Sequence, residues 1–120
     1  MGTVAPAELE KRAYFRYIEA MRRDDVIARL KETEPVLRGF GVAALYLFGS
    51  HARDEAQSNS DVDVFVDPVP GDRFGFLPFM DALETIQKAV GDDAKVDYGT
   101  RDGLSPYIRA DVEREAVRVF

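Results

Sequence analysis

The sequence predicts an α/β fold of the α+β type, a mixed sheet of about four strands flanked by helices. Residues 42–48 are an unbroken apolar run, which is typical of a strand covered on both faces. Residues 61–66 begin by alternating acidic and apolar side chains, a period of two that indicates a second strand. Apolar residues three and four positions apart over residues 74–90 predict a long amphipathic helix.

The first 23 residues are expected to form a helical extension ahead of one domain over residues 24–120. Within residues 7–21, apolar side chains recur every fourth position, as they do on one face of a helix. These side chains are Leu9, Ala13, Tyr17 and Met21. We interpret this helix as packing on the core or on a second copy of the chain, which leaves room for a homo-oligomer.

A second helix is expected to follow, capped by Asp24 or Asp25. Pro35 predicts a kink or a break one residue earlier, because proline removes a backbone donor from a helix. Gly39 and Gly41 are expected to end the helix before the first strand. Its buried stripe is predicted to consist of Val26, Ile27, Leu30, Val36 and Leu37.

After the first strand we expect one short helical turn within residues 51–57, a polar loop, and a strand over residues 61–67 that Pro68 ends. The helix over residues 74–90 is expected to end at Gly91 and to bury its apolar stripe in the core. That stripe is Phe76, Phe79, Met80, Leu83, Ile86 and Val90.

Three short elements complete the predicted domain. Residues 94–98 alternate and are expected to form a strand beside residues 61–67. A last helix is expected from Leu104 or Ser105 to about residue 116, with a proline in its first turn and with Ile108 and Val112 facing inward. Residues 117–120 are expected to form a closing strand.

The composition excludes several classes of protein. The chain has 120 residues, no cysteine and a net charge of −6. The absence of cysteine excludes disulfides and thiolate sites and fits a cytoplasmic protein. No apolar run approaches membrane length, so we expect no membrane partner. The acidic balance argues against a grip on long nucleic acid, which needs a basic face.

The chemistry of the chain is concentrated between residues 47 and 67. Asp61 and Asp63 are two apart on a strand, so their carboxylates project from the same face. Like charges side by side are destabilising, and a divalent cation with a preference for oxygen ligands would relieve them. Upstream, Gly49 allows close approach of the backbone to a ligand, and Ser50 can donate its hydroxyl or cap a short helix.

These residues resemble the signature of the nucleotidyltransferase superfamily related to DNA polymerase beta. The signature consists of Gly49-Ser50, ten intervening residues, and Asp61-Val62-Asp63. More closely, residues 48–53 (FGSHAR) and 60–63 (SDVD) resemble the minimal nucleotidyltransferases, small single-domain members of that superfamily. The family often has glycine where this chain has Asp54, so the loop carries an extra negative charge.

The resemblance implies an enzyme that transfers AMP from its substrate ATP with the help of two Mg²⁺ ions. Asp97 occupies the place of the family's third carboxylate, which binds metal and helps to deprotonate the incoming hydroxyl. The implied catalytic residues and metal ligands are Asp61, Asp63 and Asp97. Gly49 and Ser50 would hold the β- and γ-phosphates. Arg53 can reach a phosphate oxygen, although a plain surface role is equally open.

The acceptor is implied by resemblance alone. Minimal nucleotidyltransferases are often antitoxins that transfer AMP to a tyrosine of a HEPN-type RNase toxin, which would be the partner here. Two alternatives stay open: a binding module that neutralises its partner by contact, and a nucleotidyltransferase for small molecules. His51, the single histidine, is given at most a supporting contact, because no second histidine or cysteine exists for a zinc site.

Overall fold

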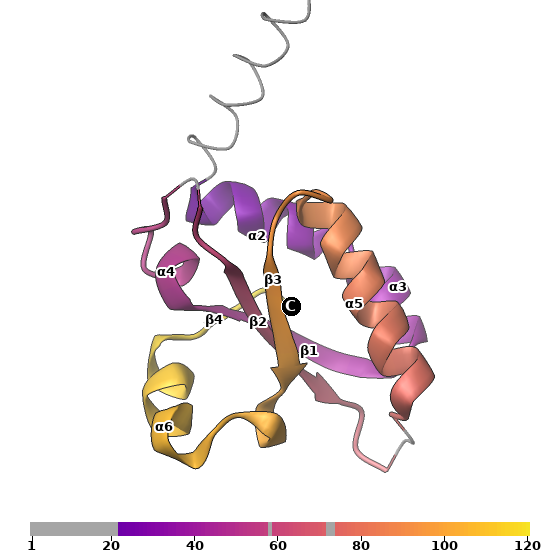
Figure 1. Ribbon diagram of the computed structural model, residues 1–120. Coiled ribbons are helices and arrows are strands. Elements are labelled where there is room, and N and C mark those ends of the chain that lie inside the picture. The colour runs from indigo at the N-terminus through magenta and orange to yellow at the C-terminus, as the bar shows by residue number, and fades with distance from the viewer. Residues whose placement is uncertain (1–21, 58, 72–73) are drawn as a thin grey trace, which may run out of the picture.

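The structure is a computed structural model that describes residues 22–57, 59–71 and 74–120 (Figure 1). The helix predicted over residues 7–21 lies outside these described residues. The elements are α2 (Arg23–Lys31), α3 (Glu34–Gly39), β1 (Val42–Phe48), α4 (Gly49–Ala52), β2 (Val62–Pro68), α5 (Phe76–Val90), β3 (Val96–Thr100), the 3₁₀ helix η1 (Arg101–Gly103), α6 (Pro106–Glu115) and β4 (Val117–Arg118). None of the helices in the described ranges has the length and apolar character needed to span a bilayer.

The four strands form one sheet in the order β3-β2-β1-β4. β1 pairs antiparallel with both β2 and β4, whereas β2 and β3 run parallel. The predicted mixed sheet flanked by helices is therefore confirmed, and so are the bounds of the first strand. The third strand lies beside the second, as the sequence predicts.

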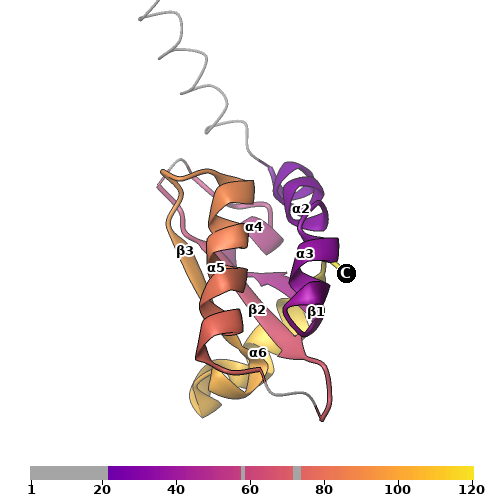
Figure 2. The ribbon, with the colours of Figure 1, turned by 90° about the vertical axis from the view of Figure 1, so that its right-hand side faces the viewer.

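Helices α2, α3 and α5 cover one face of the sheet, and Figure 2 shows them in front of it. Alternate side chains of β1 and β2 point into this core, because successive residues of a strand face opposite sides. The strand residues of the core include Leu45, Leu47, Val62, Val64 and Val66. The opposite face carries Tyr46, Phe48 and Phe65, and α4 and α6 lie on that side (Figure 1). This second face is covered only in part, so the expected full cover of β1 on both sides is wrong.

The break predicted at Pro35 is confirmed, because α2 ends at Lys31 and α3 begins at Glu34 with the proline in its first turn. The predicted cap is wrong: Arg22 precedes the first turn of α2, and its amide donates to the carboxylate of Asp25 at 3.1 Å. The break also explains an error in the predicted stripe. Because α3 is a separate helix, the spacing of buried positions in α2 does not continue into it. Leu37 is buried, whereas its neighbour Val36 is 48% exposed.

Helix α5 begins at Phe76, two residues later than predicted, and ends at Gly91 as expected. Its buried face consists of Ala82, Ile86 and Val90. The predicted core position of Met80 is wrong, because residues two apart lie on nearly opposite sides of a helix and Met80 is two from Ala82. Phe76 is also wrongly placed in the core: it opens the helix and is 74% exposed.

Several boundaries differ from prediction, among them those of α4, which spans Gly49–Ala52 rather than lying within residues 51–57, and the end of β3, which is Thr100 rather than residue 98. Asp61 lies one residue before β2, and Pro68 is its last residue, a strand end where a missing amide is tolerated. β3 starts at Val96 because Ala94 bonds back to Gly91 in a turn. α6 begins at Pro106, one residue after the expected start at Leu104 or Ser105, and the hydroxyl of Ser105 caps it by accepting from the amide of Tyr107.

Two further expectations about the C-terminal elements need correction. Val112 of α6 is buried as predicted, but Ile108 is 48% exposed, because the first turn of α6 stands away from the sheet (Figure 1). The closing strand β4 is only two residues long. Two residues after β4, the carbonyl of Phe120 still bonds to the sheet by accepting from the amide of Leu45.

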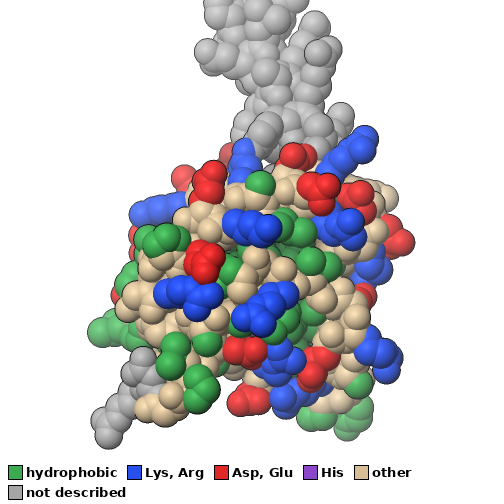
Figure 3. All heavy atoms as spheres, turned by 180° about the vertical axis from the view of Figure 1, so that it is seen from behind, with side chains coloured by type: hydrophobic (Ala, Val, Ile, Leu, Met, Phe, Trp, Pro, Cys, Tyr) green, Lys and Arg blue, Asp and Glu red, His purple; other side chains and the backbone are tan. Residues whose placement is uncertain are grey.

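The surface carries charges of both signs. Seen from behind, Lys and Arg side chains are interspersed with Asp and Glu side chains rather than gathered into one basic face (Figure 3). Several arginines are paired with carboxylates, among them Arg38 with Glu34 and Arg109 with Glu113. This face therefore offers no uniform basic surface of the kind that holds a nucleic-acid backbone.

Candidate active site

The sheet register brings the predicted carboxylates to one face. Asp63 of β2 lies opposite Phe48 of β1 on one side and Asp97 of β3 on the other. Asp61 precedes β2 by one residue and is two residues from Asp63, so it belongs to the same face. Asp61 and Asp63 are half-buried, whereas Asp97 is exposed on the edge strand. The Lys95 ammonium lies 4.0 Å from a carboxylate oxygen of Asp61.

The three carboxylates are close enough to influence one another. Burial raises the pKa of Asp63 to about 6, and the charges of Asp97 and Asp61 add to the rise. Arg53 opposes it, and the charge of Glu115 reinforces it. A carboxylate that is both desolvated and faced by like charges is a site that a cation would stabilise.

Gly49 lies directly against Asp63, the central one of the three carboxylates. It begins α4 with φ +74°, a left-handed conformation that favours glycine. A Cβ added here would collide with Oδ2 of Asp63 and would come within 3.0 Å of its Cγ. The turn that follows β1 is thus pressed onto the central carboxylate, and only a residue without a side chain fits.

Ser50 and His51 follow in the single turn of α4. Ser50 lies inside the helix, so its predicted role as the cap of the helix is wrong. His51 is 3% exposed, and burial lowers the pKa of its imidazole. Its Nδ1 is buried and has no hydrogen-bond partner among the described residues. The histidine is a buried residue of α4 itself, and the supporting contact expected for it stays a prediction.

Asp54, at the position where the family often has glycine, has its carboxylate bonded to the start of α2. Its φ is +57°, which accounts for a preference for glycine at this position. Its carboxylate accepts a hydrogen bond from the amide of Arg23 at 3.1 Å, at the start of α2. An acidic group at a helix N-terminus is favourable, so Asp54 has a structural partner of its own.

Glu115 is a member of the site that the sequence reading missed. Its Oε1 accepts from the amide of Gly49 at 3.1 Å, and its Oε2 accepts from Nη1 of Arg53 at 2.9 Å. Arg53 also donates from Nε to Glu55 at 3.2 Å. No local pattern marks Glu115, because it reaches these partners from more than sixty residues along the chain.

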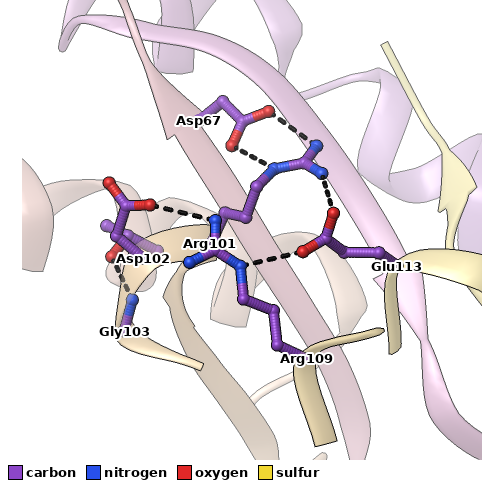
Figure 4. Close-up of polar contacts among 7 residues, drawn as sticks. Asp67, Arg101, Asp102, Gly103, Arg109 and Glu113 are labelled. Atoms are coloured by element: carbon purple, nitrogen blue, oxygen red, sulfur yellow. Dashed lines mark hydrogen bonds and ion pairs between the residues drawn. The ribbon is translucent and has the colours of Figure 1, made fainter. Parts of the chain in front are cut away.

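Arg101 is a second residue that the sequence reading missed. Figure 4 shows its guanidinium bonded to both oxygens of Asp67, at 3.0 and 2.9 Å, and to Glu113 at 3.1 Å. The guanidinium also lies 4.9 Å from the ring centre of Tyr46 and 5.0 Å from that of Phe65, which stack on each other. Arg101 therefore closes the sheet face beside the candidate site and ties η1 and α6 to β2.

Carboxylate oxygens at Asp61, Asp63 and Asp97 are the ligand type that Mg²⁺ prefers, and the pKa of Asp63 is raised by burial first and by the charges of Asp97 and Asp61 next. In this chemical sense the residues fit the ion that the fold family implies. Across residues 22–57, 59–71 and 74–120, however, no three acidic or histidine side chains are already gathered closely enough to hold an ion together. Asp61 and Asp63 follow one another along the chain, just before and within β2, and Asp97 lies beside Asp63 on β3.

The model of the nucleotidyltransferase domain family matches residues 23–119. The chain belongs to this family. The family recognised from Gly49-Ser50 and Asp61-Val62-Asp63 is thus confirmed. The nucleotidyltransferase is 35% identical over 82 residues to the protein adenylyltransferase MntA of Thermococcus cleftensis, covering 67% of this chain and 77% of that protein.

Two further comparisons agree. A protein of Methanocaldococcus jannaschii named "putative protein adenylyltransferase" is 28% identical over 92 residues, covering 75% of this nucleotidyltransferase and 90% of that protein. A solved structure described as a "putative minimal nucleotidyltransferase" superposes with a TM-score of 0.67 at 28% identity, covering 82% of this chain and 96% of that one. The fold and the family are therefore those of a minimal nucleotidyltransferase.

Proposed function

We propose that this nucleotidyltransferase transfers AMP from ATP to a hydroxyl group of a partner protein. The observation that carries the proposal is the alignment of Asp61, Asp63 and Asp97 on one sheet face, with the Gly49 turn pressed against Asp63. This chain covers 77% of the relative named protein adenylyltransferase MntA and 90% of the one named "putative protein adenylyltransferase". These names support AMP as the group transferred and a protein as the acceptor.

Asp61, Asp63 and Asp97 would hold magnesium. Bound there, the ions would neutralise the charge that develops on the attacking and leaving oxygens. The Gly49 turn and the Ser50 hydroxyl would fix the β- and γ-phosphates, with Arg53 beside them. The attacking hydroxyl oxygen bonds to the α-phosphorus while the bond from the α-phosphorus to the α–β bridging oxygen breaks. The hydroxyl proton passes to the carboxylate of Asp97, and pyrophosphate leaves.

The exposure of Asp97 supports a macromolecular acceptor. This carboxylate lies on the edge strand β3, so a side chain on another protein can approach it from solvent. The net charge of −6 suits a partner with a basic surface. We propose a tyrosine of a HEPN-type RNase toxin as the acceptor and silencing of that toxin as the outcome. An added phosphate and base would obstruct RNA entry at a basic cleft.

The test is a reaction of the purified HEPN-type partner with this chain, ATP and magnesium, followed by intact mass spectrometry. The proposal expects the partner to gain one or more AMP units with the wild-type chain and none with Asp61→Ala plus Asp63→Ala. Glu84→Gln, which alters an exposed pair with Lys88 on α5, is the matched control and should transfer normally. If the double variant neutralises the toxin and the wild-type chain adds no mass, the protein is instead a binding module.

A further inference from the structure

Glu115 joins two groups that the family resemblance assigns to phosphate binding. One carboxylate oxygen accepts from the amide of Gly49 and the other accepts from the guanidinium of Arg53. The glutamate is the last residue of α6, whereas both partners belong to the turn after β1. One side chain therefore fixes the relative position of a backbone amide and a guanidinium at the edge of the candidate site.

This contact differs from an ordinary surface ion pair. The neighbouring pair of Arg53 with Glu55 is local in sequence, and the glutamate is 67% exposed. The side chain of Glu115 is only 30% exposed, and its bond to Gly49 is partly buried. Hydrogen bonds from an amide and a guanidinium to an ionised carboxylate are among the stronger ones, and their strength increases away from water.

The arginine retains capacity for a ligand. A guanidinium has five N–H donors, and within the described part of the chain Arg53 uses one on Nε and one on Nη1. Its Nη2 group is left for another acceptor. Glu115 thus orients the guanidinium and leaves N–H donors available for a phosphate. The charge of Glu115 also reaches Asp63, whose pKa it helps to raise, so the glutamate lies near the central carboxylate.

We propose that Glu115 is a positioning residue for the triphosphate: it holds the Gly49 turn and the Arg53 guanidinium in the arrangement that receives the β- and γ-phosphates. The inference rests on the proposed function, because it takes a nucleoside triphosphate as the ligand. It goes beyond the motif by assigning a role to α6, which carries none of the signature residues. A nucleotide without β- and γ-phosphates should not depend on Glu115.

The test measures the affinity of ATP and of AMP, each with magnesium, for the wild-type chain and four variants. Glu115→Gln keeps an acceptor for the Gly49 amide but loses the charge that holds Arg53, and Glu115→Ala loses both. Arg53→Gln removes the guanidinium, and Glu84→Gln is the control. Removing a residue that orients a metal ligand commonly lowers affinity or activity about 10- to 100-fold, and we take this range for the contact made by Glu115. We expect that loss for ATP with Glu115→Ala, a smaller loss with Glu115→Gln, and unchanged AMP affinity with every variant.

A double variant tests whether Glu115 acts by positioning Arg53 or only by supporting the fold. Glu115→Gln combined with Arg53→Gln should bind ATP no more weakly than Arg53→Gln alone, because the glutamate acts through the arginine. Equal losses for ATP and AMP, or fully additive losses, would assign Glu115 a merely structural role and overturn the inference. Tighter ATP binding by Glu115→Gln would overturn it too, by showing that the glutamate competes with phosphate.

The outcome for the wild-type chain distinguishes this inference from the function on which it rests. Wild-type binding of Mg–ATP with unchanged binding by every Glu115 variant would overturn only the role of Glu115. Failure of the wild-type chain to bind Mg–ATP would overturn the proposed function and this inference with it. If Glu115→Ala unfolds, Glu115→Gln and its combination with Arg53→Gln decide the matter, because glutamine keeps the size and shape of the side chain.

Discussion

Asp63 is the residue at which the stability and the proposed chemistry of this protein oppose each other. It is half-buried, it faces two other carboxylates, and the backbone of Gly49 presses against it. Burial and the neighbouring carboxylates both disfavour the ionised form of Asp63 in the folded chain, and a bound cation would offset them. Such conflicts are common at functional sites, where local rules of stability are broken.

The first prediction concerns the pH dependence of Asp63→Asn. The pKa of Asp63 is about 6 in the folded chain, above its ordinary value of 3.8, so folding favours the protonated form. Stability is therefore lost as pH rises through this range. In EDTA at pH 7, the free energy of unfolding of Asp63→Asn should exceed that of the wild-type chain by roughly 1 kcal/mol, after allowance for solvent screening. The difference should vanish near pH 4.

Urea unfolding at both pH values measures this difference, with Asp81→Asn, an exposed aspartate on α5, as the control. Magnesium should then stabilise the wild-type chain at pH 7 and leave Asp63→Asn unaffected. A variant less stable than the wild-type chain in EDTA at pH 7 would show that the Asp63 charge is compensated within the protein, contrary to our account.

The second prediction separates the carboxylates by role. Asp97→Asn should abolish AMP transfer and retain much of the affinity for Mg–ATP, because Asp61 and Asp63 still face the nucleotide. Asp63→Asn should lower both. Calorimetry for binding and a transfer assay for chemistry provide the two readouts. Transfer at the wild-type rate by Asp97→Asn would remove Asp97 from the mechanism.

At the scale of elements, long-range polar contacts hold the short helices η1 and α6 against the sheet, in addition to their own local caps. η1 and α6 reach the sheet through Arg101, which bonds to Asp67 and Glu113, and Arg109 adds bonds to Glu113 and Asp102 (Figure 4). Because Arg101 also covers the stacked rings of Tyr46 and Phe65, it combines a charge pair with apolar contact.

The third prediction follows from this arrangement. Arg101→Met should lower the free energy of unfolding by about 2–3 kcal/mol, because it leaves the partly buried carboxylate of Asp67 without its partner. Arg101→Lys should cost less but should not restore stability, since lysine cannot make the two parallel bonds. Chemical denaturation compares them with Lys88→Met, which alters an exposed pair and should cost under about 0.5 kcal/mol. Equal losses for Arg101→Met and Lys88→Met would contradict the role given to Arg101.

The sequence predicted what depends on neighbours along the chain. The first strand, the break at Pro35 and the Gly49 turn follow local rules, and each is found where expected. Glu115 and Arg101 were missed, because their partners come from distant elements that only the folded chain brings together. Burial at Phe76 was misjudged for a related reason: periodicity shows which side of a helix is apolar but not where the sheet beneath it ends.

At the scale of the whole molecule, the two faces of the sheet have separate tasks. Helices α2, α3 and α5 bury one face and supply the core, so the other is free to hold charge. Along that second face lie the predicted catalytic carboxylates, the turn that contacts them, and the glutamate and arginine that join the turn to α6. The edge position of β3 leaves the face open to a second protein.

The central claim is that this face transfers a nucleotidyl group. The most direct measurement uses ATP labelled at the α-phosphate in one reaction and at the γ-phosphate in another, each with magnesium and the purified HEPN-type partner. Our account predicts that label from the α-phosphate becomes attached to the partner, that label from the γ-phosphate is released in pyrophosphate, and that EDTA abolishes both results. Attachment of the γ-label, or no attachment of the α-label by a wild-type chain that binds Mg–ATP, would contradict it.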